Sequence, residues 1–408
     1  MYKYNIILYV LAPYLILKII LTSFYRRSGT LFMLQRLGYK LNKSSKKTIW
    51  IHAASVGETK IAIRLYEKLE KLYPDSCFLI SSTTSSSKSI IPKISNLDHC
   101  YLPVDWLLAS RRFIKNINPK ICIIIETEIW PNMLVNCKKS LIPTIIVNGR
   151  LTNKTLNTGN FIKSIYKIAM QNIGTIVCKS ESEKDKFINL GAASDKVSVG
   201  GNLKFSEFQY QNSRDNIINR KYILALSTHP DEERQIITEW LKVNDKKVLL
   251  VIAPRHPERL GDILADLPLD MLKIAIRSKN ETIRKSTQIY IADTVGEAEC
   301  LIEHCEFVFI GGSLVDHGGQ NFLEAASYGK SIIVGPYMYN FIEETEEFLK
   351  KNAIIMVKNS NTLKHVFERL LKSKQRKNLF GDNAKKIMHS KNDIMTNYLK
   401  TIQSLIIE

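Results

Sequence analysis

Short apolar runs alternate with amphipathic segments along most of the chain, and this rhythm constrains the fold more than any other feature. From Thr48 onward, runs rich in β-branched residues predict buried strands, among them residues 48–53 and 121–125. Between such runs lie helical patterns, for example Glu58 to Tyr73, which ends before Pro74. Alternation of this kind is typical of a parallel, doubly wound sheet. The sequence therefore predicts an α/β fold of the Rossmann type.

A polar stretch between Asn202 and Arg220 interrupts this rhythm, which restarts at Tyr222. A chain of 408 residues is long enough for two domains with separate cores. We expect two Rossmann-like domains that face a cleft at the carboxyl ends of their strands. The predicted parts are an N-terminal segment at 1–25, a first domain at 26–205, a linker at 206–220, and a second domain with C-terminal helices at 221–408.

The N-terminal segment is strongly apolar from Ile6 to Leu21, although Pro13 and Lys18 interrupt it. Arg26 and Arg27 follow directly, and no small-residue cleavage site is present. We predict one uncleaved membrane anchor helix, and the positive-inside tendency then leaves the remaining chain in the cytoplasm. The alternative interpretation is a buried core helix.

The chain is basic, with a formal net charge of +19, and therefore attracts polyanions. Lysines are scattered along helices and no nucleic-acid-binding signature is present, so we expect no nucleic-acid partner. The seven cysteines form no C-x-x-C pair, which favours a reducing compartment. Only Cys300, His304 and Cys305 approach a metal-ligand pattern, and no second ligand pair accompanies them. We expect neither a metal nor another cofactor.

A glycine-rich stretch from Phe307 to Pro336 predicts a strand, a loop and a helix from Asn321 to Tyr328 that ends at Gly329. Such a loop aims backbone N–H groups at one point, so a phosphate is its natural ligand. Glu324, one turn into the helix, is placed to accept hydrogen bonds from a ribose. The alternative is a strand-to-helix turn that needs glycine for its geometry alone.

Three carboxylates follow predicted strands in the first half of the chain. Glu58 comes after residues 48–53 through a turn at Gly57, and Glu126 and Glu128 come directly after residues 121–125. Glu58 is either a helix cap with a depressed pKa or a general base that deprotonates a hydroxyl nucleophile. For Glu126 the structural alternative is an N-terminal cap or an inter-strand hydrogen bond.

In the second half, Arg255 follows a strand inside a loop fixed by two prolines, and its planar fork suits a phosphate or a carboxylate. An ordinary surface salt bridge is the alternative. Residues 293–299 predict another strand-to-helix junction, with Glu297 in the first helical turn. His256 and His317 are possible acid–base groups, although single histidines in loops are more often solvated than catalytic.

Five motifs occur in an order that resembles the bacterial Kdo transferase family, where Kdo is 3-deoxy-D-manno-octulosonic acid. They are HAASVGE (52–58), ETEIWPN (126–132), GNLKF (201–205), PRHPER (254–259) and GGSLVDHGGQNFLEAA (311–326). The resemblance implies a GT-B glycosyltransferase that transfers Kdo from CMP-Kdo to a lipid A precursor, lipid IVA. It also implies a place at the cytoplasmic face of the bacterial inner membrane.

The same resemblance assigns roles to individual residues. It makes Glu58 the proton acceptor, and Glu126 and Lys204 the groups that stabilise the transition state. It assigns CMP binding to Pro254, Arg255, Val295, Gly296, Glu297, Asn321, Phe322, Leu323 and Glu324. The chain departs from the family pattern at Asn202, where serine is common, at Phe322, where proline is common, and within the variable residues 316–320.

Two alternative functions stay open at this point. One is a GT-B enzyme for another nucleotide sugar, or a nucleotide-sugar epimerase. The other is a membrane-tethered polyanion-binding protein without catalysis. Neither the oligomeric state nor the number of Kdo residues added follows from the sequence.

Overall fold

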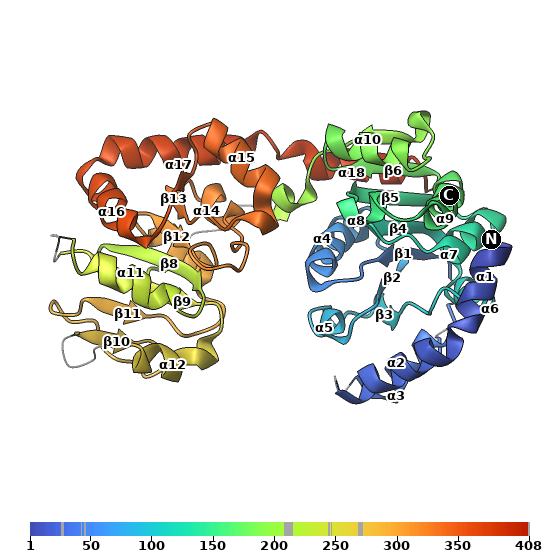
Figure 1. The fold of residues 1–408 in the computed structure, drawn as a ribbon, viewed down its shortest axis with the longest axis horizontal. Coiled ribbons are helices and arrows are strands. Elements are labelled where there is room, and N and C mark those ends of the chain that lie inside the picture. The colour runs from blue at the N-terminus through green and yellow to red at the C-terminus, as the bar shows by residue number, and fades with distance from the viewer. Residues whose placement is uncertain are drawn as a thin grey trace. The chain divides into compact units, whose positions relative to one another are not determined.

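The computed structural model describes residues 1–25, 28–41, 43–44, 46–207, 215–243, 245, 247–267 and 272–406. The chain forms two compact units (Figure 1). Unit 1 comprises Met1–Glu207 with Asp393–Glu408, and unit 2 comprises Phe208–Asn392. Of the predicted features, Arg26, Arg27 and the linker residues 208–214 lie outside the described residues.

Unit 1 contains a parallel sheet with the strand order β3-β2-β1-β4-β5-β6-β7 (Figure 1). Its strands are β1 (Thr48–His52), β2 (Cys77–Ser82), β3 (Leu97–Tyr101), β4 (Pro119–Ile125), β5 (Thr144–Gly149), β6 (Thr175–Cys178) and β7 (Val197–Val199). Its helical elements are α1 (Tyr2–Val10), α2 (Ala12–Tyr25), α3 (Gly29–Arg36), α4 (Val56–Leu72), α5 (Ser85–Lys88), α6 (Leu107–Ile117), α7 (Pro131–Lys139), α8 (Asn153–Leu156), α9 (Asn160–Gln171), α10 (Glu181–Asn189), α18 (Asp393–Gln403), η1 (Ser194–Lys196) and η2 (Leu203–Glu207).

Unit 2 contains a second parallel sheet, with the order β10-β11-β9-β8-β12-β13-β14 (Figure 1). Its strands are β8 (Tyr222–Thr228), β9 (Leu249–Pro254), β10 (Ile274–Ile276), β11 (Ile289–Ile291), β12 (Val308–Ile310), β13 (Ile332–Val334) and β14 (Ile355–Met356). Its helical elements are α11 (Glu232–Trp240), α12 (Leu260–Ala265), α13 (Ala298–His304), α14 (Leu323–Ser327), α15 (Ile342–Lys350), α16 (Leu363–Lys372), α17 (Lys374–His389), η3 (Pro257–Arg259), η5 (Tyr339–Phe341) and η6 (Ser360–Thr362).

The central strands of both sheets are buried on both faces, as β1 and β9 show along their whole length. This burial explains why they are continuous apolar runs instead of alternating ones. Each unit has its own core, in which Trp50 packs edge-on against Phe113 in unit 1 and Phe307 stacks on Phe367 in unit 2. The prediction of two doubly wound α/β domains is confirmed, and the cleft between them stays a prediction.

The N-terminal segment forms two helices where one anchor helix was predicted. α1 and α2 meet at Leu11, and their axes are bent by 56°. Pro13 explains the break, because its ring lacks an N–H and clashes with the carbonyl of the preceding turn. In the part of the chain that the structure describes, no single helix has the length and apolar character of a membrane span, although α1 and α2 together do.

The last helix, α18, belongs to unit 1, which differs from the predicted second domain at 221–408. Its Tyr398 is fully buried, and the hydroxyl bonds the Gly201 carbonyl at 2.9 Å. Gly201 has φ +90, and a Cβ there would stand 2.8 Å from Ile394 of α18. Tight packing of this kind, made by residues far apart in the sequence, ties the C-terminus to unit 1.

In each sheet the strand order reverses beside the first strand of the unit. The reversal lies between β1 and β4 in unit 1 and between β8 and β12 in unit 2. Loops that leave two such strands diverge to opposite faces, so ligands bind at this point beyond the carboxyl ends of the strands. The two reversal points therefore locate the candidate site of each unit.

Candidate functional site

Glu58 follows β1 and closes the N-terminus of α4. Its Oε2 accepts a 2.8 Å hydrogen bond from the Ala54 backbone N–H, and its Oε1 accepts one of 2.8 Å from the Ser55 hydroxyl. Ser55 is the N-cap, and its Oγ in turn accepts the Glu58 N–H at 3.3 Å. The arrangement is a capping box, so the cap predicted as one interpretation of Glu58 is present.

The electrostatic surroundings of Glu58 differ from the prediction of a depressed pKa. Burial is the largest influence and raises the pKa of this carboxyl above its ordinary value. The hydrogen bonds from Ala54 and Ser55 lower it, while Glu126 and Glu128 raise it again. The prediction was wrong because desolvation outweighs the helix terminus. A carboxylate with a raised pKa is a better proton acceptor.

Glu126 leaves the end of β4 in an uncommon backbone conformation. Its φ is +60, in the left-handed region that non-glycine residues rarely adopt. Its N–H donates to the Val147 carbonyl of neighbouring β5 at 2.9 Å, which is the inter-strand bond predicted as an alternative. The side chain lies 3.6 Å from Nε of Arg150. Strained residues cluster at functional sites, which is consistent with a role for this carboxylate.

Glu128 lies close to a hydrogen-bonded chain of Trp50, Ser81 and His52 that sequence reasoning missed. The Trp50 indole donates to Ser81 Oγ at 2.7 Å, and Ser81 Oγ lies 2.9 Å from Nδ1 of the buried His52. With the Ser81 hydroxyl donating to Nδ1, the His52 Nε2–H points toward Glu128 Oε2, 3.6 Å away. The Trp130 indole donates to the same oxygen at 2.9 Å. A histidine at a strand end was the available signal.

Lys204 lies on η2, which packs against α4 and α18. The Lys204 backbone N–H donates to Asn202 Oδ1 at 3.0 Å, and the Leu203 N–H donates to Asn148 Oδ1 at 2.9 Å. These amides fix the turn of the GNLKF motif against the end of β5. The structure therefore brings Glu58, Glu126 and Lys204 to the same end of unit 1.

The glycine-rich loop of unit 2 is already filled by a carboxylate of the chain itself. Glu232 is fully buried, and it accepts hydrogen bonds from the N–H groups of Gly312, Ser313 and Leu314 at 2.6, 2.9 and 2.8 Å. The prediction that these amides bind a phosphate is therefore wrong for this part of the loop. Glu232 occupies the position that an anionic ligand would take.

Arg255 follows β9, and its N–H donates to the Thr228 carbonyl at 3.0 Å. Its side chain is exposed, and no carboxylate among the described residues pairs with its guanidinium. The surface salt bridge predicted as an alternative is therefore not formed within the described residues. Pro254 is the last residue of β9 and is buried, so it lies beneath the loop that carries Arg255.

Residues 295–297 form an exposed turn before α13. The Val295 side chain is 88% exposed, and Gly296 has φ +94. Glu297 stands at the N-cap of α13, one position before the predicted helical turn. Arg277 donates to its carboxylate at 2.6 Å, and this bond is the main reason that the pKa of Glu297 is lowered. Arg277, the residue directly after β10, thereby holds the turn.

Residues 321–324 begin the short helix α14, which starts at Leu323 and not at Asn321 as predicted. Asn321 Oδ1 accepts the Leu323 N–H at 3.0 Å. Phe322 and Leu323 are fully buried, and Phe322 packs edge-on against Phe348. Only the backbone of these two residues is available to a ligand, whereas Glu324 is partly exposed.

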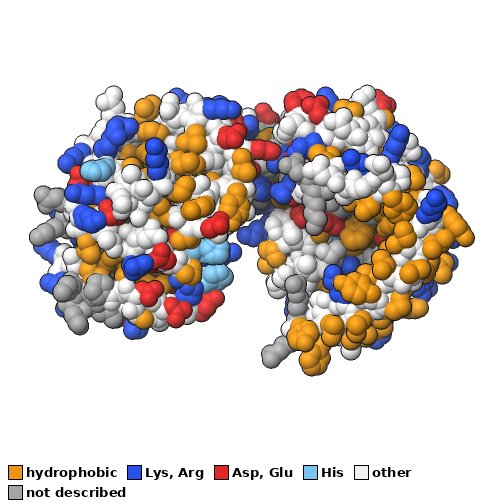
Figure 2. All heavy atoms as spheres, viewed as in Figure 1, with side chains coloured by type: hydrophobic (Ala, Val, Ile, Leu, Met, Phe, Trp, Pro, Cys, Tyr) orange, Lys and Arg blue, Asp and Glu red, His pale blue; other side chains and the backbone are white. Residues whose placement is uncertain are grey.

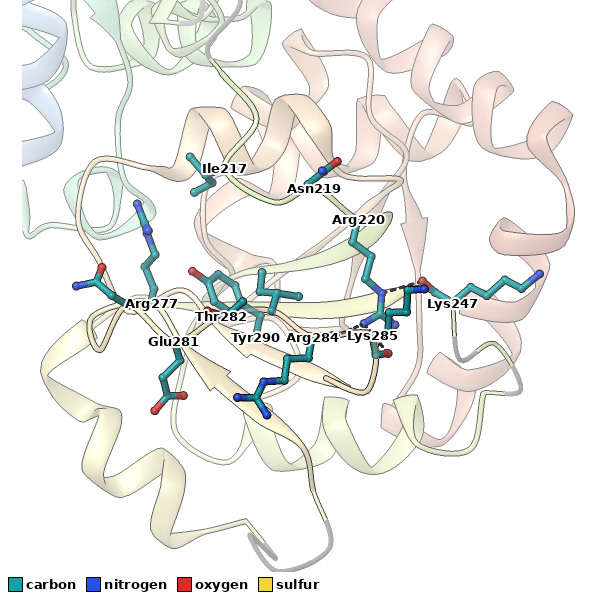
Figure 3. Close-up of a pocket in the computed structure, with 12 residues that line it drawn as sticks. Ile217, Asn219, Arg220, Lys247, Arg277, Glu281, Thr282, Arg284, Lys285 and Tyr290 are labelled. Carbon is teal, nitrogen blue, oxygen red and sulfur yellow. Dashed lines mark hydrogen bonds between the residues drawn. The ribbon is translucent and has the colours of Figure 1, made fainter.

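A cavity of about 650 Å³ lies elsewhere in unit 2, and none of the predicted CMP residues lines it. Figure 3 shows Arg277, Tyr290 and Arg220 among the residues around it. Arg277 connects this cavity to the predicted site, because it lines the cavity and donates a hydrogen bond to Glu297. Within the described ranges, no group of three or more His, Cys, Asp or Glu side chains is placed to hold a metal ion.

Comparisons with known proteins identify the family. A family model described as 3-deoxy-D-manno-octulosonic-acid transferase (kdotransferase) matches residues 33–207. A protein named 3-deoxy-D-manno-octulosonic acid transferase from Rickettsia felis is 32% identical over 377 residues, which cover 89% of this chain and 80% of that protein. The protein of the same name from Haemophilus influenzae is 28% identical over 373 residues, with coverages of 87% and 86%.

Among solved structures, UDP-GlcNAc 2-epimerase from Neisseria meningitidis bound to UDP-GlcNAc is 12% identical, with a TM-score of 0.59. The match covers 88% of this chain and 100% of that one, and it shows similarity of fold alone. The fold and the two strand-end sites define the class as a GT-B-like protein of two Rossmann domains. The chain belongs to the Kdo transferase family, as its motifs predicted, and is a glycosyltransferase.

Proposed function

We propose that this protein is an inverting glycosyltransferase that moves Kdo from CMP-Kdo to a lipid A precursor, lipid IVA. The observation that carries the proposal is Glu58, a partly buried carboxylate with a raised pKa beside the strand reversal of unit 1. Family membership supports the sugar, and the placement of Glu126 and Lys204 at the same end of unit 1 supports the chemistry.

In the proposed reaction, Glu58 accepts the proton of the acceptor hydroxyl while that oxygen bonds the anomeric carbon of Kdo. The bond from the anomeric carbon to the phosphate oxygen breaks, and CMP leaves as a phosphate monoester. One displacement inverts the configuration. Charge develops on the sugar ring and on the leaving phosphate, so Glu126 and Lys204 stabilise the transition state electrostatically.

The proposed donor-binding residues lie in unit 2. Arg255 meets the phosphate, Glu324 accepts hydrogen bonds from the ribose, and the exposed turn at 295–297 lies against the base. Pro254, Asn321, Phe322 and Leu323 shape this surface or contact the nucleotide through their backbone, since Phe322 and Leu323 are buried. We include no metal in the proposal. EDTA should leave the rate unchanged, and a strict divalent-cation requirement would contradict this part.

The proposed acceptor is an anionic lipid, and we propose that the protein works at the cytoplasmic face of the inner membrane. The net charge of +19 favours phosphates and anionic headgroups. α1 and α2 also expose many large apolar side chains, and Figure 2 shows apolar atoms gathered along that part of unit 1. Exposed apolar faces of this kind bind membranes. The helices are proposed to lie on the membrane surface.

The test incubates purified protein with CMP-Kdo and lipid IVA and follows the lipid by mass spectrometry. Addition of whole Kdo residues, with inhibition by CMP and not by UDP, is the expected result. Inhibition by UDP alone would favour a GT-B enzyme for another nucleotide sugar. Salt-sensitive lipid or nucleic-acid binding without any turnover would favour the non-catalytic polyanion-binding protein.

A further inference from the structure

Three imidazoles converge at the strand reversal of unit 2. His229 follows β8, His256 follows β9, and His317 lies in the loop after β12. The ring centroids of His229 and His317 are 4.1 Å apart, and those of His229 and His256 are 6.2 Å apart. Figure 2 shows histidine side chains grouped on this face of unit 2. His229 is buried, whereas His256 and His317 are exposed.

Backbone amides around the histidines are already committed. Glu232 takes the N–H groups of Gly312, Ser313 and Leu314, and it also accepts the His229 N–H at 3.0 Å. Farther along the loop, the Gly319 and Gln320 N–H groups donate to the Gly312 and Gly311 carbonyls. An anion that reaches this point must therefore be met mainly by side chains.

Charged groups of both signs lie around His229, and most of the carboxylates are already engaged by other groups. Arg259 is paired with the buried Glu233 at 3.2 Å, and His256 lies 3.2 Å from the exposed Glu258. Arg255 has no carboxylate partner among the described residues. The carboxylate of Glu232 already accepts hydrogen bonds from backbone N–H groups. Exposed Asp316 adjoins His317 in the chain.

This environment keeps His229 neutral. Burial is the main cause that lowers the pKa of His229 to about 4, and His317, His256, Arg259 and Arg255 lower it further. Gln320 Nε2 lies 2.9 Å from His229 Nε2 and donates to it, so the ring carries its proton on Nδ1. Turning the Gln320 amide by half a rotation presents its oxygen instead, which suits a ring protonated at both nitrogens.

We propose that the cluster of His229, His256 and His317 binds the phosphate of the nucleotide and takes up a proton as the nucleotide binds. A phosphate dianion beside Arg255 adds negative charge next to the cluster, so a positive charge on an imidazole becomes favourable. The proton comes from solvent and rests on an imidazole nitrogen that donates to a phosphate oxygen. The inference rests on the proposed function in taking the nucleotide to be CMP.

The test is isothermal titration calorimetry of the full chain at pH 7 with CMP, UMP and cytidine, each in two buffers of different ionisation enthalpy. Near this pH a phosphate monoester is mostly a dianion, because its second pKa is about 6, so it has few protons of its own to exchange. We expect the protein to take up roughly half a proton or more when it binds CMP. It should take up none when it binds cytidine.

His317→Gln and His229→Gln should each remove the proton uptake. Each should also lower the affinity for CMP about tenfold, which is the loss expected for one charged hydrogen bond. Both variants should bind cytidine as the wild type does, which shows that unit 2 is folded. His365→Gln, at an exposed histidine of α16, is the matched control and should behave like the wild type.

Unchanged proton uptake in both cluster variants, or none in the wild type, would overturn the inference. So would a failure of every phosphorylated probe to bind. Proton-linked binding of UMP without binding of CMP would support the inference and contradict the proposed donor. Proton-linked binding of CMP without any Kdo transfer would likewise support the histidine site and count against the proposed function alone.

Discussion

The hydroxyl of Tyr398 donates a 2.9 Å hydrogen bond to the carbonyl oxygen of Gly201. Tyr398 lies on α18 near the end of the chain, and Gly201 begins the motif that carries Lys204. The same hydroxyl accepts the Asn148 N–H at 3.2 Å. One buried phenol from the C-terminal helix thus joins the end of β5 to the loop after β7 in unit 1.

Tyr398→Phe should lower the free energy of unfolding by about 1–2 kcal/mol, because it leaves buried backbone groups without their partner. It should also lower kcat more than it raises KM, because Lys204 shifts. Urea denaturation and steady-state kinetics measure the two effects. Tyr25→Phe, at an exposed ring, is the control. A stable variant with wild-type kinetics would show that the hydroxyl has no role.

Glu126→Gly should separate stability from activity. Because Glu126 has φ +60, glycine relieves backbone strain at this position. The free energy of unfolding should therefore stay the same or rise by up to about 1 kcal/mol, and the melting temperature should follow it. Glu126→Ala keeps the strain and should not gain this stability. Both variants should lose activity. Thermal denaturation decides the matter, and a glycine variant less stable than the alanine variant would contradict the strain argument.

The pH dependence of kcat/KM should report Glu58. Since the pKa of this carboxyl is raised, its deprotonated form should be lost as pH falls through a value above the usual one of about 4.3. We therefore expect kcat/KM to rise with pH on the acidic limb. A flat profile down to the ordinary carboxyl range would argue against Glu58 as the base.

Asp105 should make unit 1 less stable as pH rises. It is buried and accepts hydrogen bonds from Asn132 N–H at 2.8 Å and from Tyr4 of α1 at 2.9 Å. Burial raises its pKa to about 7, above the value of an unfolded chain, so its contribution is complete at low pH and is lost as pH rises through 7. Denaturation across pH 5 to 8 measures this.

Asp105→Asn should remove that part of the pH dependence. Asp98→Asn, at an exposed aspartate of β3, is the matched control and should keep it. The same slope in wild type and Asp105→Asn would show that another group is responsible.

The fold followed from the sequence because its strands are buried on both faces and so appear as unbroken β-branched runs, as in β1 and β4. β10 and β14 went unpredicted, and β14 has only two residues, which are too few to give a period. The place of α18 was also missed, because the Tyr398 contacts join positions about 200 residues apart.

The strand ends that carry the candidate residues were predictable from the sequence, and the electrostatics of those residues were not. Position after a strand located Glu58, Glu126 and Arg255, because polar groups at strand ends are where α/β sites form. Burial was not visible in the sequence, so the direction of the Glu58 pKa was wrong. The internal carboxylate of Glu232 was missed for the same reason, since its partners lie about 80 residues away.

The most direct test of the central claim compares wild type, Glu58→Gln and Glu67→Gln in the transfer of Kdo from CMP-Kdo to lipid IVA. Glu67 lies exposed on the same helix, α4, and serves as the matched control. The account predicts Kdo-bearing lipid from wild type and Glu67→Gln, and a rate lower by about 10²–10⁴-fold in folded Glu58→Gln. Wild-type transfer by Glu58→Gln, or no transfer by folded wild-type protein, would contradict it.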